Sequence, residues 1–396
     1  MADRKETRTP AHDRAVRRPL GTSGLLSPYE AMRLSLLSPR LAGHALYDGF
    51  SRRRPSFPRV LNMYLTDRCN FACPMCALGE ARAKRLRSTH ADMPVDMFDR
   101  AARDARRHGA YMLLSGGEPL LHKNLDQLLR ITKRHRVVTY LTTNGFLLAD
   151  KAESLAAGGV QILQISLDGW DDESQYERGH VHGAYEAIVV GVRRLRALRR
   201  RGPFPIIRAV TTVTKTNVGE LERIEASLVE IGISEWQISN YFFATRAIVD
   251  AHQRFHEETG LGANLALDPV DDDCYLESLK VVQLQRSLES IPRKCQRDGI
   301  RLEYAWGTDL PQYYSPREPS PLSQCTMLDS VVEVRPDGRM SICNDAVTIG
   351  ALGADTIQQA WQGDEMRRFL KVYRERGILP MCFRCCGICQ ANAVRF

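Results

Sequence analysis

Between residues 58 and 239, short apolar runs alternate with amphipathic segments, and this alternation limits the possible folds more than any other feature. The apolar runs begin near residues 60, 111, 137, 161, 206 and 236, and a segment of helical period follows each of the first five. Strands that alternate with helices form a parallel sheet with right-handed crossovers. The sequence therefore predicts an α/β fold.

The first apolar run ends at three cysteines, Cys69, Cys73 and Cys76, with the spacing C-x3-C-x2-C. A cubane iron–sulfur cluster has four irons, so three thiolates leave one iron open to a small ligand. A structural zinc site normally has a fourth ligand close by. A zinc knuckle or buried thiols are the alternatives, and the open ligand count favours an enzyme.

Polar segments end three of the later strands, at residues 115–119, 143–145 and 166–169. The C-terminal ends of parallel strands lie on one side of a sheet, so we expect these segments to form one rim with the cysteines. Paired glycines in the first segment let the backbone approach a ligand closely. The rim suits a polar, zwitterionic ligand held against the open iron.

Residues 58–245 resemble the radical S-adenosylmethionine (radical SAM) superfamily, whose hallmark is C-x3-C-x2-C followed by a strand that ends in Gly-Gly-Glu-Pro. The resemblance implies a partial (β/α)6 TIM-like barrel. It also implies that the open iron of a [4Fe-4S] cluster binds the methionine end of SAM. Reductive cleavage of SAM then gives a 5′-deoxyadenosyl radical, which abstracts a hydrogen atom from a substrate.

The resemblance assigns roles to positions of this chain. It implies that Cys69, Cys73 and Cys76 bind the cluster. The residues it implies for SAM binding are Gly116, Gly117, Glu118, Asn144, Ser166, Asp168 and Arg178. Among these, Ser166, Asp168 and Arg178 have structural alternatives, namely a helix cap, a turn residue and a surface charge.

A second group of cysteines lies near the C-terminus. Cys325 and Cys343 flank a predicted hairpin over 331–342, and a later C-x2-C begins at Cys382. Four thiolates close a site, and zinc satisfies this count as well. The order resembles the auxiliary-cluster domains called SPASM and, when shortened, twitch. The resemblance implies one auxiliary [4Fe-4S] cluster bound by Cys325, Cys343, Cys382 and Cys385, and either Cys386 or Cys389 is an alternative ligand.

Two further cysteines, Cys274 and Cys295, have no place in either group. A thiol beside the substrate returns a hydrogen atom to the substrate radical in radical epimerases, so both are candidate hydrogen donors. The alternative is a buried cysteine that acts as a small apolar residue.

Composition limits where the chain works. It has 396 residues, 11 cysteines and a net charge of +8, and its first residues show no signal-peptide pattern. These features favour a reducing, cytoplasmic location with cysteines used for metal binding. No apolar run is long enough for a membrane span. The arginines lack interleaved aromatic residues, so we expect a solvated surface and no nucleic acid.

The pattern divides the chain into three parts. Residues 1–57 read as a disordered start and an amphipathic helical cap, 58–310 as the barrel with a following helix and strand, and 321–396 as a small α+β auxiliary-cluster domain. Residues 1–57 show no strand pattern for a leader-peptide-binding domain. We therefore expect a small-molecule or lipid-like substrate before a peptide, with flavodoxin or ferredoxin as reductant.

The main hypothesis is a radical SAM oxidoreductase in biosynthesis that dehydrogenates its substrate or forms a bond in it. One alternative is a redox-neutral epimerase that uses a cysteine as hydrogen donor. Another is a non-catalytic metal-binding interaction protein.

Overall fold

The computed structural model describes most of the chain from residue 54 onward. The described residues are 54–76, 91–198, 205–262, 270, 276–304, 310–314, 325, 328, 330–343, 345–377, 379–382 and 394–395. Residues 1–53, which contain the predicted N-terminal helical cap, lie outside them. Four cysteines named above also lie outside them: Cys274, Cys385, Cys386 and Cys389.

The described strands form one sheet with the order β10-β9-β8-β1-β2-β3-β4-β5-β6-β7-β11. The strands are β1 (Val60–Thr66), β2 (Tyr111–Gly116), β3 (Thr139–Thr143), β4 (Ile162–Ser166), β5 (Ile206–Thr212), β6 (Glu235–Ser239), β7 (Arg301–Tyr304), β8 (Val331–Val334), β9 (Arg339–Ile342), β10 (Val347–Ala351) and β11 (Val394–Arg395). Neighbours from β8 through β1 to β7 are parallel. The six predicted strands and the parallel α/β sheet are confirmed.

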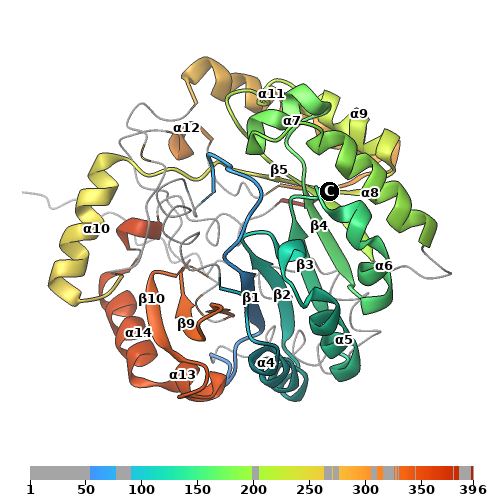
Figure 1. Cartoon of the computed structure of the whole chain (residues 1–396). Helices are drawn as coiled ribbons and strands as arrows, with labels where there is room; N and C mark the ends of the chain where they lie inside the picture. The colour runs from blue at the N-terminus through green and yellow to red at the C-terminus, as the bar shows by residue number, and fades with distance from the viewer. Residues whose placement is uncertain are drawn as a thin grey trace, which may run out of the picture.

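Helices cover the outer side of the curved sheet (Figure 1). Those that connect the first strands are α4 (Val95–His108), α5 (Leu125–His135), α6 (Leu148–Gly158), α7 (Asp172–Gly179), α8 (Ala184–Leu198) and α9 (Leu221–Ile231). The later ones are α10 (Arg246–Thr259), α11 (Ser278–Asp298), α12 (Leu310–Tyr313), α13 (Ile357–Gln362) and α14 (Asp364–Arg376). Two 3-10 turns, η1 (Pro119–Leu121) and η3 (Pro380–Cys382), complete the described helices.

The two faces of the sheet have different cores. On β1, Leu61, Met63 and Leu65 belong to the large core between sheet and helices, whereas Val60 belongs to a second apolar cluster. This second cluster takes Val138, which directly precedes β3, and one residue from each of six neighbouring strands, Val60, Tyr111, Tyr140, Ile162, Ile206 and Val331. Since side chains alternate along a strand, the second cluster lies on the inner, concave face. It fills the amino end of the barrel, and polar residues follow it toward the carboxyl end.

The C-terminal segment does not form a sheet of its own. Strand β8 pairs with β1 in parallel register, Val60 with Val331 and Met63 with Val334, and β9 and β10 then extend the edge antiparallel. The predicted hairpin over 331–342 is confirmed. It joins the barrel directly, because its apolar residues Val332 and Val334 are completely buried in the shared core.

Some helix predictions were wrong. Helix α7 was not predicted, because its sequence is polar; a capping box between Asp171 and Ser174 begins it instead of an apolar stripe. Helix α10 was also missed. The amphipathic pattern from 357 to 375 suggests one helix, but the structure has two, α13 and α14, since Gly363 takes an extended conformation with φ −72° and ψ 175° between them.

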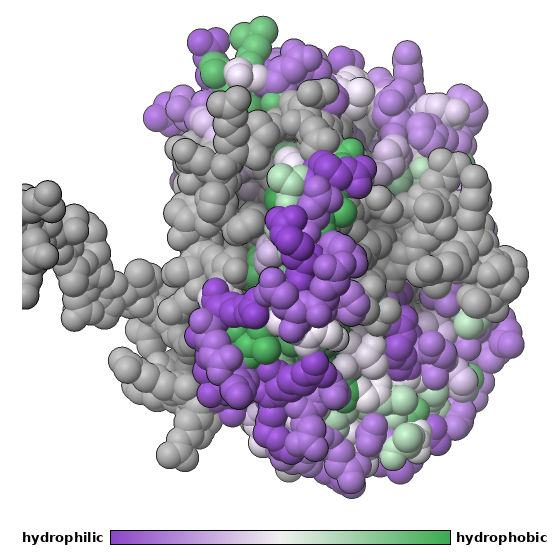
Figure 2. Space-filling model, turned by 90° about the vertical axis from the view of Figure 1, so that its left-hand side faces the viewer, coloured by the Kyte–Doolittle hydropathy of each residue, from purple (hydrophilic) through white to green (hydrophobic). Residues whose placement is uncertain are grey.

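Among the described residues, no helix is both long and apolar enough to cross a membrane. The face shown in Figure 2, over α10 and α14, is largely hydrophilic where it is described. Several of its arginines are paired with acids, as in Arg367 with Asp364 and Arg376 with Glu258. Such pairs are typical of a solvated helix surface.

Candidate functional site

The cysteine loop follows β1 and is fixed by the end of β2. The backbone N–H groups of Gly117 and Glu118 donate to the carbonyl oxygens of Thr66 and Arg68, each at 2.7 Å. A Cβ atom on Gly117 would lie 2.1 Å from the Arg68 oxygen, closer than any real contact. Glycine is therefore required here for the approach of the two loops, and not only for the approach of a ligand.

Glu118 connects the ends of β2 and β3. The residue is 1% exposed. Its carboxylate accepts hydrogen bonds from Leu120 N at 3.0 Å, Thr143 Oγ1 at 2.7 Å and Asn144 N at 2.8 Å. Burial raises the pKa of Glu118 to about 6, and the three donors act in the opposite direction. The side chain thus holds the rim together, and its predicted contact with SAM stays a prediction.

Two more contacts reach the cysteine loop from the rim. Asn144 Nδ2 donates to Asn70 Oδ1 at 2.8 Å. On the other side, the ring of Phe71 packs against Gly179 at the end of α7, where a Cβ atom would lie 2.1 Å from the ring. Ala72 N also donates to the Gly179 carbonyl at 3.2 Å. The loop is therefore held from β2, β3 and α7 together.

Arg178 and Asp168 form a largely buried ion pair beside the cysteines. The carboxylate also accepts from Thr212 N at 2.7 Å. The pKa of Asp168 is raised by burial, although Arg178 opposes this change. Arg178 likewise acts on Cys73, whose pKa is nonetheless raised by burial to about 12. The guanidinium is thus close enough to Cys73 to stabilise negative charge on its sulfur.

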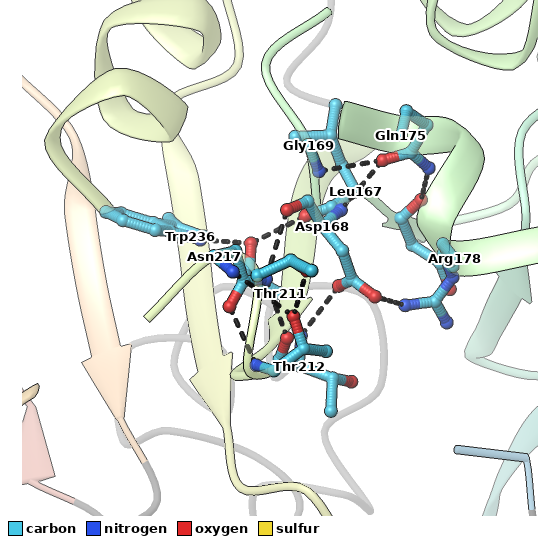
Figure 3. A network of polar contacts seen from close by, with 12 residues as sticks. Leu167, Asp168, Gly169, Gln175, Arg178, Thr211, Thr212, Asn217 and Trp236 are labelled. Carbon is cyan, nitrogen blue, oxygen red and sulfur yellow. Dashed lines mark hydrogen bonds and ion pairs between the residues drawn. The ribbon is translucent and has the colours of Figure 1, made fainter. Parts of the chain in front are cut away.

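A network around Gln175 fixes this ion pair (Figure 3). Gln175 is completely buried, and its Oε1 accepts from the N–H groups of Asp168 and Gly169, both at 2.9 Å. Its Nε2 donates to the Ser166 carbonyl at 3.3 Å. Asn217 Nδ2 donates to the Asp168 carbonyl at 3.0 Å. The residues predicted at this strand end are therefore positioned by two buried amides.

Asn70, Gln175 and Asn217 contribute to the site but were not predicted from the sequence. Asn70 stands inside the cysteine motif, which was a usable signal. Gln175 and Asn217 gave none, because a buried amide in a polar segment looks like a solvent-exposed one until the fold is known.

The chemistry of the donor set fits an iron–sulfur cluster. Charge on Cys76 raises the pKa of both Cys69 and Cys73, so the three thiols lie close together. Burial raises the pKa of Cys69 to about 11. Iron binds the thiolate and lowers that pKa, and Arg178 supplies a nearby positive charge. No group of three His, Cys, Asp or Glu side chains in the described part of the chain is arranged to hold a single metal ion.

The second set of cysteines also converges. Cys325, Cys343 and Cys382 are far apart in sequence, but charge on Cys325 and on Cys382 raises the pKa of Cys343, and charge on Cys325 also raises the pKa of Cys382, which burial brings to about 12. Tyr373 joins them, since its hydroxyl oxygen accepts from Cys325 N at 3.1 Å. These three residues fit a shared site, whereas the predicted ligand Cys385 lies outside the described residues.

The turn that presents Cys343 is fixed by a buried carboxylate. Cys343 and Asp345 have positive φ angles of 60° and 68°, which non-glycine residues rarely adopt. Asp345 accepts from Arg335 Nη2 at 3.0 Å, Arg339 Nη1 at 2.8 Å and Ser341 Oγ at 2.9 Å. These bonds hold the unusual backbone in place.

Cys295 lies in a different part of the barrel. It is 1% exposed, in the last turn of α11 among core residues, and its carbonyl accepts from Ile300 N just before β7 begins. The start of a parallel strand is at the opposite end from the cysteine loop, which follows the end of β1. This position argues against Cys295 as a hydrogen donor, and Cys274 lies outside the described residues.

Comparison with known proteins agrees with these two sites. The model of the radical SAM superfamily matches residues 63–224, and that of the SPASM iron–sulfur cluster-binding domain matches 325–386. The chain contains a radical SAM domain and a C-terminal SPASM domain. The first match contains the loop of Cys69, Cys73 and Cys76, and the second contains Cys325, Cys343, Cys382 and Cys385. SAM and [4Fe-4S] clusters are the cofactors of this pair of domains.

Individual relatives share different parts of the chain. A probable GTP 3′,8-cyclase of Methanocella arvoryzae is 32% identical over 148 residues, which are 37% of this chain and 45% of that protein. The PqqA peptide cyclase of Gluconobacter oxydans is 25% identical over 306 residues, 77% of this chain and 75% of that protein. The chain spans about half or less of the length of the first curated relatives it matches.

Solved structures show the same fold. SuiB of Streptococcus suis bound to S-adenosylmethionine has a TM-score of 0.59 at 17% identity, and covers 88% of this chain and 74% of SuiB. SuiB bound to precursor peptide SuiA has a TM-score of 0.57, also at 17% identity, over 92% of this chain and 82% of SuiB.

The expectation of a small-molecule or lipid-like substrate was wrong. It depended on the missing strand pattern in residues 1–57, but relatives of the radical SAM and SPASM pair include a peptide cyclase and a protein bound to a precursor peptide. A leader-binding domain and the reacting site are separate structures, so the absence of a pattern for one says nothing about what the other accepts.

Proposed function

We propose that this chain is a radical SAM enzyme that modifies a peptide. The observation that carries the proposal is the cysteine loop, which β2, β3 and α7 hold at the carboxyl end of the barrel. The convergence of Cys325, Cys343 and Cys382 supports it. The peptide cyclase that covers 77% of this chain, and the fold shared with SuiB, favour a peptide as substrate.

When bound, the first cluster supplies the electron that cleaves SAM, and the second supplies an electron acceptor for an oxidised product. The chain's own residues prepare the first site. Arg178 brings positive charge to Cys73, and Asp168 fixes the direction of that guanidinium. Glu118 and Asn144 keep the ends of β2 and β3 together beneath the loop.

We propose that the reaction is an oxidation, either a dehydrogenation or the formation of a bond within the peptide. A closed second site with four thiolates fits a cluster that passes electrons and does not bind substrate. Epimerisation with Cys295 as hydrogen donor is not favoured by the position of that thiol at the amino end of β7.

We propose that residues 1–57, 58–310 and 321–396 act as cap, barrel and auxiliary domain. We also propose that a flavodoxin or ferredoxin is the reductant, and that the protein works in the cytoplasm without binding nucleic acid. Seven of the predicted ligands, Gly116, Gly117, Glu118, Asn144, Ser166, Asp168 and Arg178, stay proposed SAM contacts.

The test is turnover of a peptide. The anaerobically reconstituted enzyme is incubated with SAM, dithionite and the product of a short reading frame beside its gene, and the peptide is analysed by mass spectrometry. A loss of about two mass units, which a dehydrogenation or a new bond produces, supports the proposal. An unchanged peptide under conditions where SAM is cleaved would refute it, and Cys73→Ala is the control for chemistry that does not need the cluster.

A further inference from the structure

Arg335 stands at the carboxyl end of β8, on the inner face of the barrel. Every second side chain of a strand points to the same face, so residues 331, 333 and 335 share one. Val331 belongs to the inner apolar cluster, and this face is therefore the inner one. Met63 pairs with Val334, so Arg335 is level with Tyr64 on β1. The guanidinium carbon lies 3.8 Å from the centre of the Tyr64 ring. Arg335 is therefore beside the strand that leads into the cysteine loop.

The guanidinium is buried, and two of its donors have no hydrogen-bond partner among the residues that the structure describes. Its side chain is 5% exposed, and Nη2 donates to Asp345 at 3.0 Å. Nε and Nη1 are buried and make no hydrogen bond within the described structure. A buried donor without an acceptor costs free energy, so an arrangement of this kind calls for a ligand or a water at that place.

The acids around Arg335 and Arg339 already outnumber the two guanidinium groups. Asp345 pairs with both Arg335 and Arg339, and Glu333 also acts electrostatically on Arg335. Two carboxylates thus accompany two guanidinium groups, and Asp337 lies 3.9 Å from Arg339 as a further acid. An incoming carboxylate would meet this negative charge. The missing partner of Arg335 is therefore an acceptor without charge.

We infer that Arg335 binds a backbone carbonyl oxygen of the substrate peptide through Nε or Nη1. This inference rests on the proposed function, because a peptide is the substrate class whose backbone presents such oxygens in a row. A bond to the backbone positions any sequence in the same way. Arg335 thus holds the chain of the substrate beside the cysteine loop and does not select its side chains.

The experiment uses the reconstituted holoenzyme and a neutral probe, N-acetylalanine N-methylamide, with acetate as the charged comparison. Crystals are soaked with each compound, and the affinity is measured in solution by saturation-transfer NMR. We expect a carbonyl oxygen of the diamide within hydrogen-bond distance of Arg335 Nε or Nη1. Ordered water alone on both donors, or acetate bound there in preference to the diamide, would overturn the inference.

Variants separate binding from folding. Arg335→Gln should weaken the diamide by about 10-fold or more, since a hydrogen bond from a charged donor is worth that much. Arg339→Gln is the matched control, because it removes the other guanidinium of Asp345 and leaves Arg335 in place. Arg335→Lys keeps the charge at Asp345 but lacks Nε, so a partial loss is expected. Equal affinity in wild type and Arg335→Gln overturns the inference, with iron content and melting temperature as the check on folding.

The two proposals fail in different ways. If no peptide is modified while the diamide binds at Arg335, the proposed function is wrong and the backbone site stands. If a peptide is modified at an unchanged KM in Arg335→Gln, the function stands and this inference is wrong.

Discussion

Gln175→Ala tests whether the strand end beside the cysteines depends on one buried amide. The substitution removes the partner of three buried backbone groups, the N–H of Asp168, the N–H of Gly169 and the carbonyl of Ser166. A buried polar group without a partner costs about 1–3 kcal/mol, so three give about 3–9 kcal/mol. Water that enters the vacated space lowers this cost, and we expect a loss of about 3–5 kcal/mol in the free energy of unfolding.

The assay is urea unfolding of the cluster-free chain, followed by circular dichroism, together with SAM binding to the reconstituted protein. SAM affinity should fall as well, because Asp168 and its partner Arg178 lose their fixed position. Gln253→Ala is the control. The Gln253 side chain is exposed on α10 and, within the described part of the chain, bonds to Glu257 one turn away, so its loss should stay within about 0.5 kcal/mol. A cost below about 1 kcal/mol for Gln175→Ala would refute the reasoning.

Three further predictions concern the two cysteine sites. Gly117→Ala should lower both stability and iron content, because the new Cβ would lie 2.1 Å from the Arg68 oxygen. Gly183→Ala strains a backbone with φ +72° but meets nothing within 4 Å, so it should keep its iron even if it loses stability; normal iron in Gly117→Ala would contradict the contact. Cys343→Ser should reduce iron from about eight to about four per chain while SAM cleavage persists, and an unchanged iron content would exclude Cys343 as a ligand. Iron should bind more tightly at the first site as pH rises from about 7 to 9, because the thiols must lose protons to bind iron and burial raises the pKa of Cys69 to about 11. An iron affinity that does not change with pH would contradict this.

The sequence was enough to predict the parallel sheet, since its strands are apolar and its helices amphipathic. It was enough to place Cys69, Cys73 and Cys76 at a strand end for the same reason. The helix α7 escaped prediction because its two buried residues, Gln175 and Gly179, give no apolar period. The polar sequence of α7 therefore gave no helical signal, although the folded chain packs this helix against the cysteine loop.

The pairing of β8 with β1 also could not be predicted from the sequence. Nothing local shows that Val331 pairs with Val60, which is 271 positions earlier in the chain. The consequence for the site is considerable, because this pairing brings Arg335 onto Tyr64. Long-range pairing of this kind follows from the shared core, which only the folded chain displays.

The central claim is that the loop of Cys69, Cys73 and Cys76 holds a cluster that cleaves SAM. Its most direct test is the formation of 5′-deoxyadenosine by the anaerobically reconstituted protein with SAM and dithionite, beside Cys73→Ala. We expect 5′-deoxyadenosine from the wild type and none above background from the variant. Equal amounts from both proteins, or none from a wild type that carries its full iron, would contradict it.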